Sequence, residues 1–328
     1  MNQKHNISSV LINTNARLHM GFFDLNGQRC RQFGSLGVSL DAPCTKIELT
    51  IAQDAVETQD EQDYVFKSKR LVLDYLGITE NVDIQVLEQV PRHSGLGSGT
   101  QMALAIGVGI CRLFNRHLSL QEIAQVVGRG ARSGIGIGTF AQGGLVLDGG
   151  RGKHTQIPPM IARYDFPTDW RILLIFDHQN IGVHGAEEQA AFKMLKPHDQ
   201  ALTEKLSYHI LMQALPALVE ADLKQFGEAI AILQAYTGDY FAPIQGGRYA
   251  SKSVAQVLEY LREQGTVCVG QSSWGPTGFA VFENQIEAER ITQQLKLKYT
   301  DSDLSWLICS AQNAGATVIE RNKLENKG

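Results

Sequence analysis

The strongest local signal in the sequence is the segment at residues 91–101, which reads Pro91-Arg92-His93-Ser94-Gly95-Leu96-Gly97-Ser98-Gly99-Thr100-Gln101. Before it, apolar residues at 82, 84 and 86 alternate with polar ones, which is typical of a half-buried strand. After it, the apolar run 102–114 predicts a buried helix. The glycines allow backbone amides to turn inward, and the helix adds its positive N-terminal end. The segment is therefore predicted to hold an anion, most simply a diphosphate.

This segment differs from two better-known phosphate-binding loops. No Gly-Lys-Ser or Gly-Lys-Thr follows, so it is not a Walker loop. Gly95 and Gly97 have the spacing of a dinucleotide loop, but Thr100 stands where that pattern needs a third glycine. A helix entry that serves only packing is the alternative. The residues predicted to bind phosphate are Ser94, Gly95, Leu96, Gly97, Ser98, Gly99 and Thr100, and the Ser98 and Thr100 hydroxyls could also reach a metal ion.

Length and composition limit the classes of function. The 328 residues suffice for one two-lobed domain or two ordinary ones, and 43% are hydrophobic. A net charge of −4 gives no basic field for nucleic acid, so an anionic substrate must be held by local groups. No apolar run is long enough to span a membrane. Five scattered cysteines and a polar start at residues 1–9 lead us to expect a cytoplasmic protein with reduced thiols.

Strands and helices are predicted in blocks, which indicates the α+β class. Helical spacing predicts helices over 64–76, 120–128, 186–194, 202–219, 223–236, 251–264 and 286–299. Gly77 and Ser119 are expected to cap the first two of them. Strands are predicted over 10–12, 37–38, 46–51, 82–90, 171–177, 267–269, 279–282 and 305–309. The proline-containing stretch 157–167 is the expected link between two lobes.

Four further segments carry polar residues that could act on a substrate. Residues 15–24 place Arg17, His19 and Asp24 among apolar neighbours, although a strand with a solvated face explains them equally well. His184 with Glu187 and Glu188 stands at a strand-to-helix junction, where acids commonly complement the helix dipole. In the expected loop 241–249, Arg248 could bind an anion, although an exposed arginine is equally ordinary. The segment 272–278 could contact a substrate or could be only a hairpin turn. The residues concerned there are Arg248, Ser273 and Gly275.

Taken together, these segments resemble the GHMP kinase superfamily. Residues 91–99 are similar to its phosphate loop, 272–278 to its C-terminal glycine motif, and 16–24 to its N-terminal substrate motif. Within the superfamily the chain resembles the β-ribofuranosylaminobenzene 5′-phosphate synthase family of methanopterin biosynthesis. That closer resemblance depends on residues 16–22, 133–140, 143–150 and 243–248, which span nearly the whole chain.

The resemblance implies a two-lobed fold. A first lobe similar to ribosomal protein S5 domain 2 would cover residues 1–165, and a ferredoxin-like lobe would cover 166–328. The implied reaction joins phosphoribosyl diphosphate to 4-aminobenzoate, with 4-hydroxybenzoate left open, and releases CO₂ and diphosphate. Mg²⁺ is expected, with no organic cofactor, and a homodimer is the ordinary expectation for such an enzyme.

One departure bears on the type of chemistry. Many kinases of the superfamily carry a catalytic aspartate in the second glycine-rich motif, but this chain has no acid after Gly136 until Asp148. That favours a synthase over an ATP-dependent GHMP kinase, and a non-catalytic ligand-binding relative is the third reading.

The resemblance also implies roles for single residues. Asp24, in preference to Glu187 or Glu188, would stabilise the ribosyl cation. Arg17, His19 or Arg248 would bind the departing carboxylate. The other residues expected at the substrate are His184, Glu187, Ser273 and Gly275.

Overall fold

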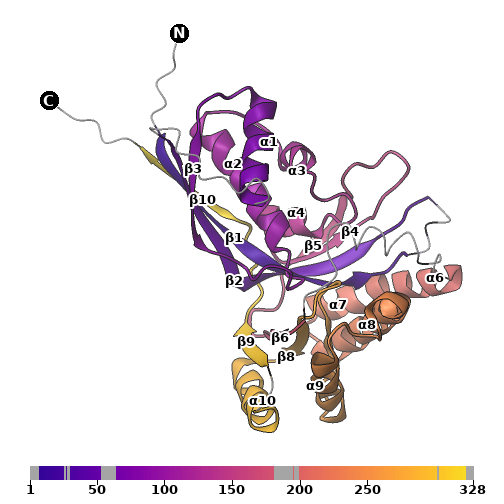
Figure 1. Cartoon of the computed structure of the whole chain (residues 1–328). Helices are drawn as coiled ribbons and strands as arrows, with labels where there is room; N and C mark the ends of the chain where they lie inside the picture. Colours follow the sequence, from indigo (N-terminus) through magenta and orange to yellow (C-terminus); the bar gives the residue numbers. More distant parts are fainter. Residues whose placement is uncertain are drawn as a thin grey trace.

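The computed structural model describes residues 7–25, 27, 30–52, 64–180, 195, 199–300 and 303–322, which form two lobes (Figure 1). The first lobe is built on two long antiparallel strands, β1 (Ile7–Phe22) and β2 (Ser35–Ile51). Its sheet has the order β10-β1-β2-β4-β5, and β3 also pairs with β2. The other strands are β3 (Val82–Glu88), β4 (Leu145–Asp148), β5 (Met160–Tyr164) and β10 (Thr317–Asn322).

Helices cover one face of this first sheet (Figure 1). They are α1 (Tyr64–Leu76), α2 (Ser98–Leu113), α3 (Leu120–Val126) and α4 (Ile135–Gln142). The α2 helix is buried on most sides, and its Met102 and Ile106 share a core with Ile12 and Leu49 of the strands. This packing explains why α2 is apolar nearly all round, since a helix with little exposed surface needs no polar face.

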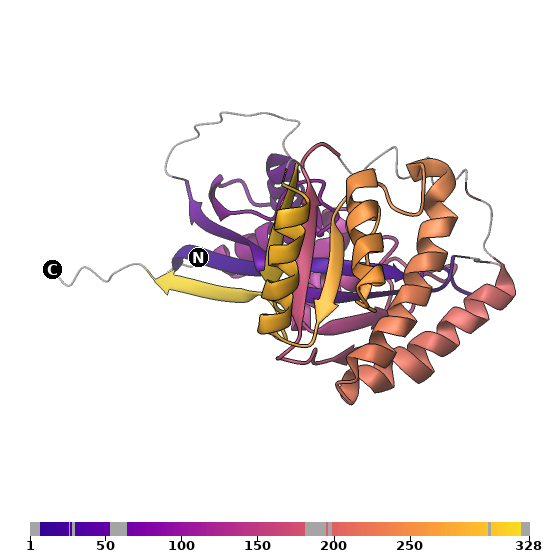
Figure 2. The ribbon, with the colours of Figure 1, turned by 90° about the horizontal axis from the view of Figure 1, so that it is seen from below.

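The second lobe has the ferredoxin-like arrangement that the family resemblance implied. Its antiparallel strands lie in the order β7-β8-β6-β9 across the sheet. Along the chain, the helix α10 connects β8 to β9. The strands are β6 (Arg171–Asp177), β7 (Val269–Gln271), β8 (Gly278–Phe282) and β9 (Leu304–Cys309). Two amphipathic helices, α9 (Lys252–Glu263) and α10 (Gln285–Lys298), pack beneath this sheet through one apolar cluster (Figure 2).

The two lobes share a core. Leu18 and Met20 of β1 belong to the same buried cluster as Leu174 of β6, together with Phe226 and Leu233 of the long helix α8 (Leu223–Gln245). Before α8 the chain forms α6 (Gln200–His209), the π-helical η1 (Ile210–Ala214) and α7 (Leu215–Val219). None of the described helices has the length and apolar character needed to cross a membrane.

Most of the predicted elements are confirmed, and Ser119 caps α3 by accepting from the Glu122 amide. One helix was not predicted, and two predictions were wrong in detail. The helix α4 lies within a glycine-rich stretch that indicated no helix, because its glycines pack closely against Val146 and Thr100. The expected link 157–167 contains β5, and the expected loop 241–249 begins inside α8. The predicted helix 186–194 lies outside the described residues.

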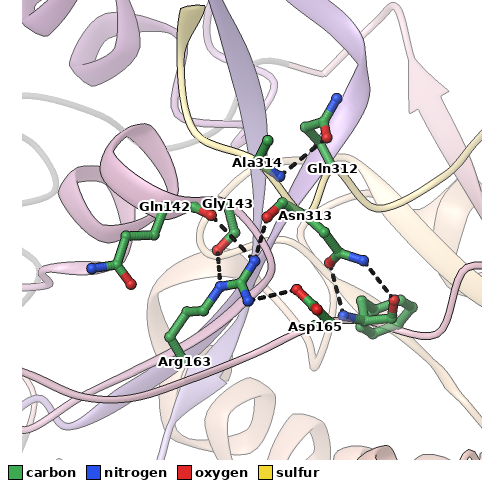
Figure 3. Close-up of polar contacts among 8 residues, drawn as sticks. Gln142, Gly143, Arg163, Asp165, Gln312, Asn313 and Ala314 are labelled. Carbon is green, nitrogen blue, oxygen red and sulfur yellow. Dashed lines mark hydrogen bonds and ion pairs between the residues drawn. The ribbon is translucent and has the colours of Figure 1, made fainter.

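The end of the chain returns to the first lobe, which the sequence did not indicate. The change of sheet falls between β5 and β6, near the predicted boundary at 165/166, but β10 pairs with β1. Arg163 and Asn313 are among the side chains that hold the returning segment (Figure 3). Arg163 donates to the carbonyls of Gln142, Gly143 and Asn313 and pairs with Asp165 at 2.5 Å. The Asn313 side chain accepts a hydrogen bond from the Phe166 amide at 2.8 Å and donates one to the Phe166 carbonyl at 2.9 Å.

Replacing Asn313 by Ala should therefore destabilise the protein. The substitution leaves the partly buried amide and carbonyl of Phe166 without their partner, which costs about 1–3 kcal/mol of unfolding free energy. Urea unfolding monitored by circular dichroism measures the change. Asn322→Ala, at an exposed side chain of β10, is the matched control and should stay within about 0.5 kcal/mol of the parent. Equal stability of the two variants would contradict the role given to Asn313.

Candidate active site

The N-terminus of α2 is open, as the sequence predicts for an anion site. The helix starts at Ser98, its N-cap residue Gly97 has φ 78°, and no side chain caps it. The loop before it also turns through His93 (φ 59°) and Gly95 (φ 80°). With no side-chain cap, the first amides of the helix face outward with the positive end of the helix dipole behind them. The predicted phosphate-binding residues 94–100 therefore lie together around one helix end.

The turn after β7 fixes this loop from the second lobe. A Cβ placed on Gly95 would lie 2.6 Å from the Ser272 carbonyl oxygen, and one on Gly275 would lie 2.5 Å from the Gly95 Cα. The buried Ser272 hydroxyl donates to the Gly95 carbonyl at 2.8 Å and accepts from the His19 amide at 3.1 Å. The Ser273 amide donates to the His19 carbonyl at 3.2 Å. Three segments far apart in sequence thus meet at one point, and Ser272 is a residue that the sequence analysis missed.

Arg17 lies along the phosphate loop. Its amide donates to the Leu96 carbonyl at 3.0 Å, and its Nη1 donates to the Gly95 carbonyl at 2.8 Å. A Cβ on Gly97 would come within 2.7 Å of the Arg17 Cγ, so only glycine leaves room for this side chain. Arg17 therefore supports the loop and brings a positive charge to it.

His19 is 1% exposed, and neither ring nitrogen has a hydrogen-bond partner within the described part of the chain. Burial and the charge of Arg17, with a smaller effect of Arg132, hold the pKa of this imidazole well below its ordinary value. The ring is neutral at pH 7 and lies 4.5 Å from the Phe22 ring, centroid to centroid. A buried ring with two unpaired nitrogens is suited to bond a ligand.

Two further arginines, which the sequence analysis did not single out, act at this site: Arg129 lies at the same helix end, and Arg132 affects His19. The Arg129 guanidinium contacts the first turn of α2, 3.2 Å from where a Cβ on Gly99 would be, and burial lowers its pKa. Arg132 acts electrostatically on His19. Both belong to the glycine-rich stretch 128–138.

Asp148, the first acid after the second glycine motif, is engaged in the fold. It is fully buried and accepts from the hydroxyls of Ser35 and Ser133 and from the amides of Gly134 and Gly150, at 2.6–3.0 Å. Burial raises the pKa of this carboxyl, against the effect of these bonds. It therefore fixes the turn into α4 and does not face a substrate.

The remaining predicted residues are placed as follows. Asp24 is half-buried just beyond β1, and its carbonyl accepts from the Phe33 amide at 2.6 Å. Arg248 forms a two-pronged pair with Asp239 of α8 at 2.7 and 2.9 Å, which raises its pKa. Its role at the substrate stays a prediction, and His184 and Glu187 lie outside the described residues. The described residues contain no cluster of three or more His, Cys, Asp or Glu that could hold a metal ion.

Comparison with known proteins agrees with this architecture. The profile of the GHMP kinases N terminal domain matches residues 63–144, and that of the GHMP kinases C terminal domain matches residues 214–301. The fold is similar to that of homoserine kinase from Cytophaga hutchinsonii, with a TM-score of 0.68, 17% identity, and 97% and 99% of the two chains covered. It is also similar to mevalonate diphosphate decarboxylase from Staphylococcus aureus, with a TM-score of 0.65, 15% identity, and 96% and 98% covered. Fold and site thus define a protein of the GHMP class.

More specific relatives are archaeal. The chain is 35% identical to the β-ribofuranosylphenol 5′-phosphate synthase of Methanocaldococcus jannaschii, over 86% of this chain and 92% of the relative. It is 31% identical to the synthase of the same name from Archaeoglobus fulgidus, over 94% and 98%. The chain belongs to this synthase family. The predicted resemblance to this family is confirmed. The relatives' names specify a phenol as part of the product, where we expected an aminobenzene.

The contact between the two glycines can be tested by substitution. Gly275→Ala should push the phosphate loop away from the turn, because the new Cβ meets backbone atoms of residues 94 and 95 that cannot rotate aside. We expect an affinity for Mg²⁺-diphosphate lower by about tenfold or more, measured by isothermal titration calorimetry. Gly247→Ala is the control, since the nearest atom to its Cβ is 3.8 Å away. An unchanged affinity in a folded Gly275→Ala protein would contradict this role.

The burial of neutral His19 predicts a pH dependence of stability. The pKa of His19 in the folded protein lies below its value of about 6.5 in the unfolded chain. At a pH between these two values, the unfolded chain binds the proton and the folded protein does not. The unfolding free energy should therefore fall as pH drops below about 6.5, by up to about 1.4 kcal/mol per pH unit. Chemical unfolding of the parent and His19→Leu between pH 5 and 7.5 isolates this contribution. The variant should lose the slope, while His154→Leu, at an exposed histidine, should keep it.

Proposed function

We propose that this chain is a pentosyltransferase that joins phosphoribosyl diphosphate to a 4-substituted benzoate, a step of methanopterin biosynthesis. The observation that carries the proposal is the uncapped N-terminus of α2, held open by two lobes and flanked by Arg17 and Arg129. Such a site stabilises a departing diphosphate, which is the main electrostatic demand of ribosyl transfer. The archaeal relatives support the same reaction, because their name describes the synthesis of a ribofuranosyl-substituted ring.

The reaction balances without an added oxidant or base. An electron pair of the ring forms a bond from the carboxylate-bearing carbon to C1 of the ribose. The bond from C1 to oxygen breaks, and its electrons leave with diphosphate. The bond to the carboxylate then breaks, its electrons restore the aromatic ring, and CO₂ departs.

Residues of this chain meet these demands in different ways. The loop amides and the arginines compensate the charge that grows on diphosphate, and neutral His19 can hydrogen-bond the sugar without repelling its cationic centre. Asp24 is proposed to face that centre. Bound Mg²⁺ would supply further positive charge to the diphosphate, with Ser98 or Thr100 as hydroxyl ligands and the substrate's own oxygens as the rest. A homodimer in the cytoplasm remains part of the proposal, and five free cysteines fit that compartment.

The acceptor follows from the product that the relatives' names describe. A ribofuranosylphenol retains a hydroxyl on the ring, which requires 4-hydroxybenzoate as its precursor, whereas 4-aminobenzoate would give the aminobenzene. We therefore propose 4-hydroxybenzoate as the first acceptor to test, beside 4-aminobenzoate. The position of Asp148 argues against the kinase alternative. Its carboxylate is buried and accepts hydrogen bonds from four donors of the fold, so it does not face a hydroxyl of a substrate.

Product analysis tests the proposal. Incubation with phosphoribosyl diphosphate, Mg²⁺ and carboxyl-labelled 4-hydroxybenzoate or 4-aminobenzoate should release labelled CO₂ and diphosphate in equal amounts. Mass spectrometry should find the corresponding ring-linked ribose 5-phosphate. Parallel incubation with ATP in place of phosphoribosyl diphosphate should give no ADP above background. ADP formation without CO₂ release would show a kinase instead, and ligand binding without any turnover would show a non-catalytic relative.

A further inference from the structure

A cleft of about 380 Å³ opens beside the phosphate loop, between the two lobes. The first lobe contributes Pro43 and the loop residues 91–94. The second lobe contributes the end of β6, the turn before β8 and one side of β9, namely Phe176, Asp177, His178, Asn180, Pro276, Thr277, Ser305 and Leu307. The volume is near the lower end for ligand pockets, which suits one ring with its substituents.

The apolar lining of the cleft is suited to a flat ring. Pro43, Pro91 and Pro276 present rigid rings without amide donors, and Phe176 and Leu307 complete the apolar surface. The lining therefore favours a planar aromatic body over a sugar.

The polar groups of the cleft differ between its two sides. On the loop side lie Arg92, whose guanidinium stacks 4.2 Å from the Tyr64 ring centroid, and His93. On the other side Asp177 accepts from the Ser251 hydroxyl and the Asn180 side chain, both at 2.5 Å. Although burial opposes ionisation, these bonds lower the pKa of Asp177, so it is a carboxylate at neutral pH. Ser305 shares a hydrogen bond of 2.8 Å with His178.

This polarity matches the orientation that the reaction requires. The ring carbon that attacks the ribose bears the carboxylate, and the ribose carries the diphosphate held at the loop. The carboxylate end of the acceptor must therefore point toward the loop and its para substituent away from it. A hydroxyl or amino group at the para position would then donate to an acceptor on the far side.

We infer that this cleft binds the aromatic acid, with its carboxylate toward Arg92 and its para hydroxyl or amino group toward Asp177 and Ser305. The inference rests on the proposed function, and it makes Asp177 and Ser305 the residues that select a para-substituted benzoate. Benzoate, which lacks the para group, should bind about tenfold more weakly than 4-hydroxybenzoate, because it cannot form the hydrogen bond on the side of Asp177 and Ser305.

Filling the cleft tests the inference. Leu307→Trp places a larger side chain in the cleft, and Leu297→Trp, at an exposed leucine of α10, is the matched control. Calorimetric titration with 4-hydroxybenzoate, in the presence of saturating Mg²⁺-diphosphate, should show an affinity lower by about tenfold or more in Leu307→Trp alone. The affinity for Mg²⁺-diphosphate should stay within about twofold of the parent in both variants.

A second variant keeps the test informative if Leu307→Trp does not fold. Ser305→Leu extends an apolar side chain into the same cleft and removes the bond to His178, so it should weaken 4-hydroxybenzoate binding likewise. Unchanged affinity for 4-hydroxybenzoate in folded cleft variants, or no binding of it to the parent protein, would overturn the inference. Binding that depends on the cleft in a protein without turnover would support the inference while the proposed function fails.

Discussion

The close backbone contact between Gly95 and Gly275 is the constraint on which the site depends. Each glycine occupies space that a Cβ on the other would need, at 2.5–2.8 Å, and backbone atoms cannot rotate out of the way. The contact joins the loop before α2 to the turn between β7 and β8, so the anion site is complete only when the two lobes are packed together. The Ser272 hydroxyl extends the contact to β1 through the His19 amide. Packing of the two lobes therefore brings the parts of the site together.

Local charge compensates for an acidic chain. The net charge is −4, yet the start of α2 gathers Arg17 and Arg129 beside a helix dipole, with Arg132 acting on His19. Burial, with the charges of Arg17 and Arg132, keeps His19 uncharged, so it can donate or accept a hydrogen bond without adding to the positive field. The carboxylate of Asp148, which could have opposed that field, is held within the fold by four donors. The site is thus arranged to receive negative charge.

The sequence alone predicted the helices with a regular apolar period and the loop at 91–101, because both depend on local patterns. It did not indicate β10, whose pairing with β1 is set by contacts such as those of Arg163 and Asn313 across the chain. Ser272 and Arg129 were missed for a similar reason, since their roles arise from partners that are distant in sequence. For Arg248 the sequence indicated an anion clamp, and the structure pairs it with Asp239.

Competition binding tests whether the diphosphate of phosphoribosyl diphosphate is held at the loop that begins α2. Labelled phosphoribosyl diphosphate is bound to the protein with Mg²⁺ and then titrated with unlabelled diphosphate or with ribose 5-phosphate. We expect complete displacement by diphosphate at a single site, and much weaker displacement by ribose 5-phosphate. Bound phosphoribosyl diphosphate that diphosphate fails to displace would contradict this expectation.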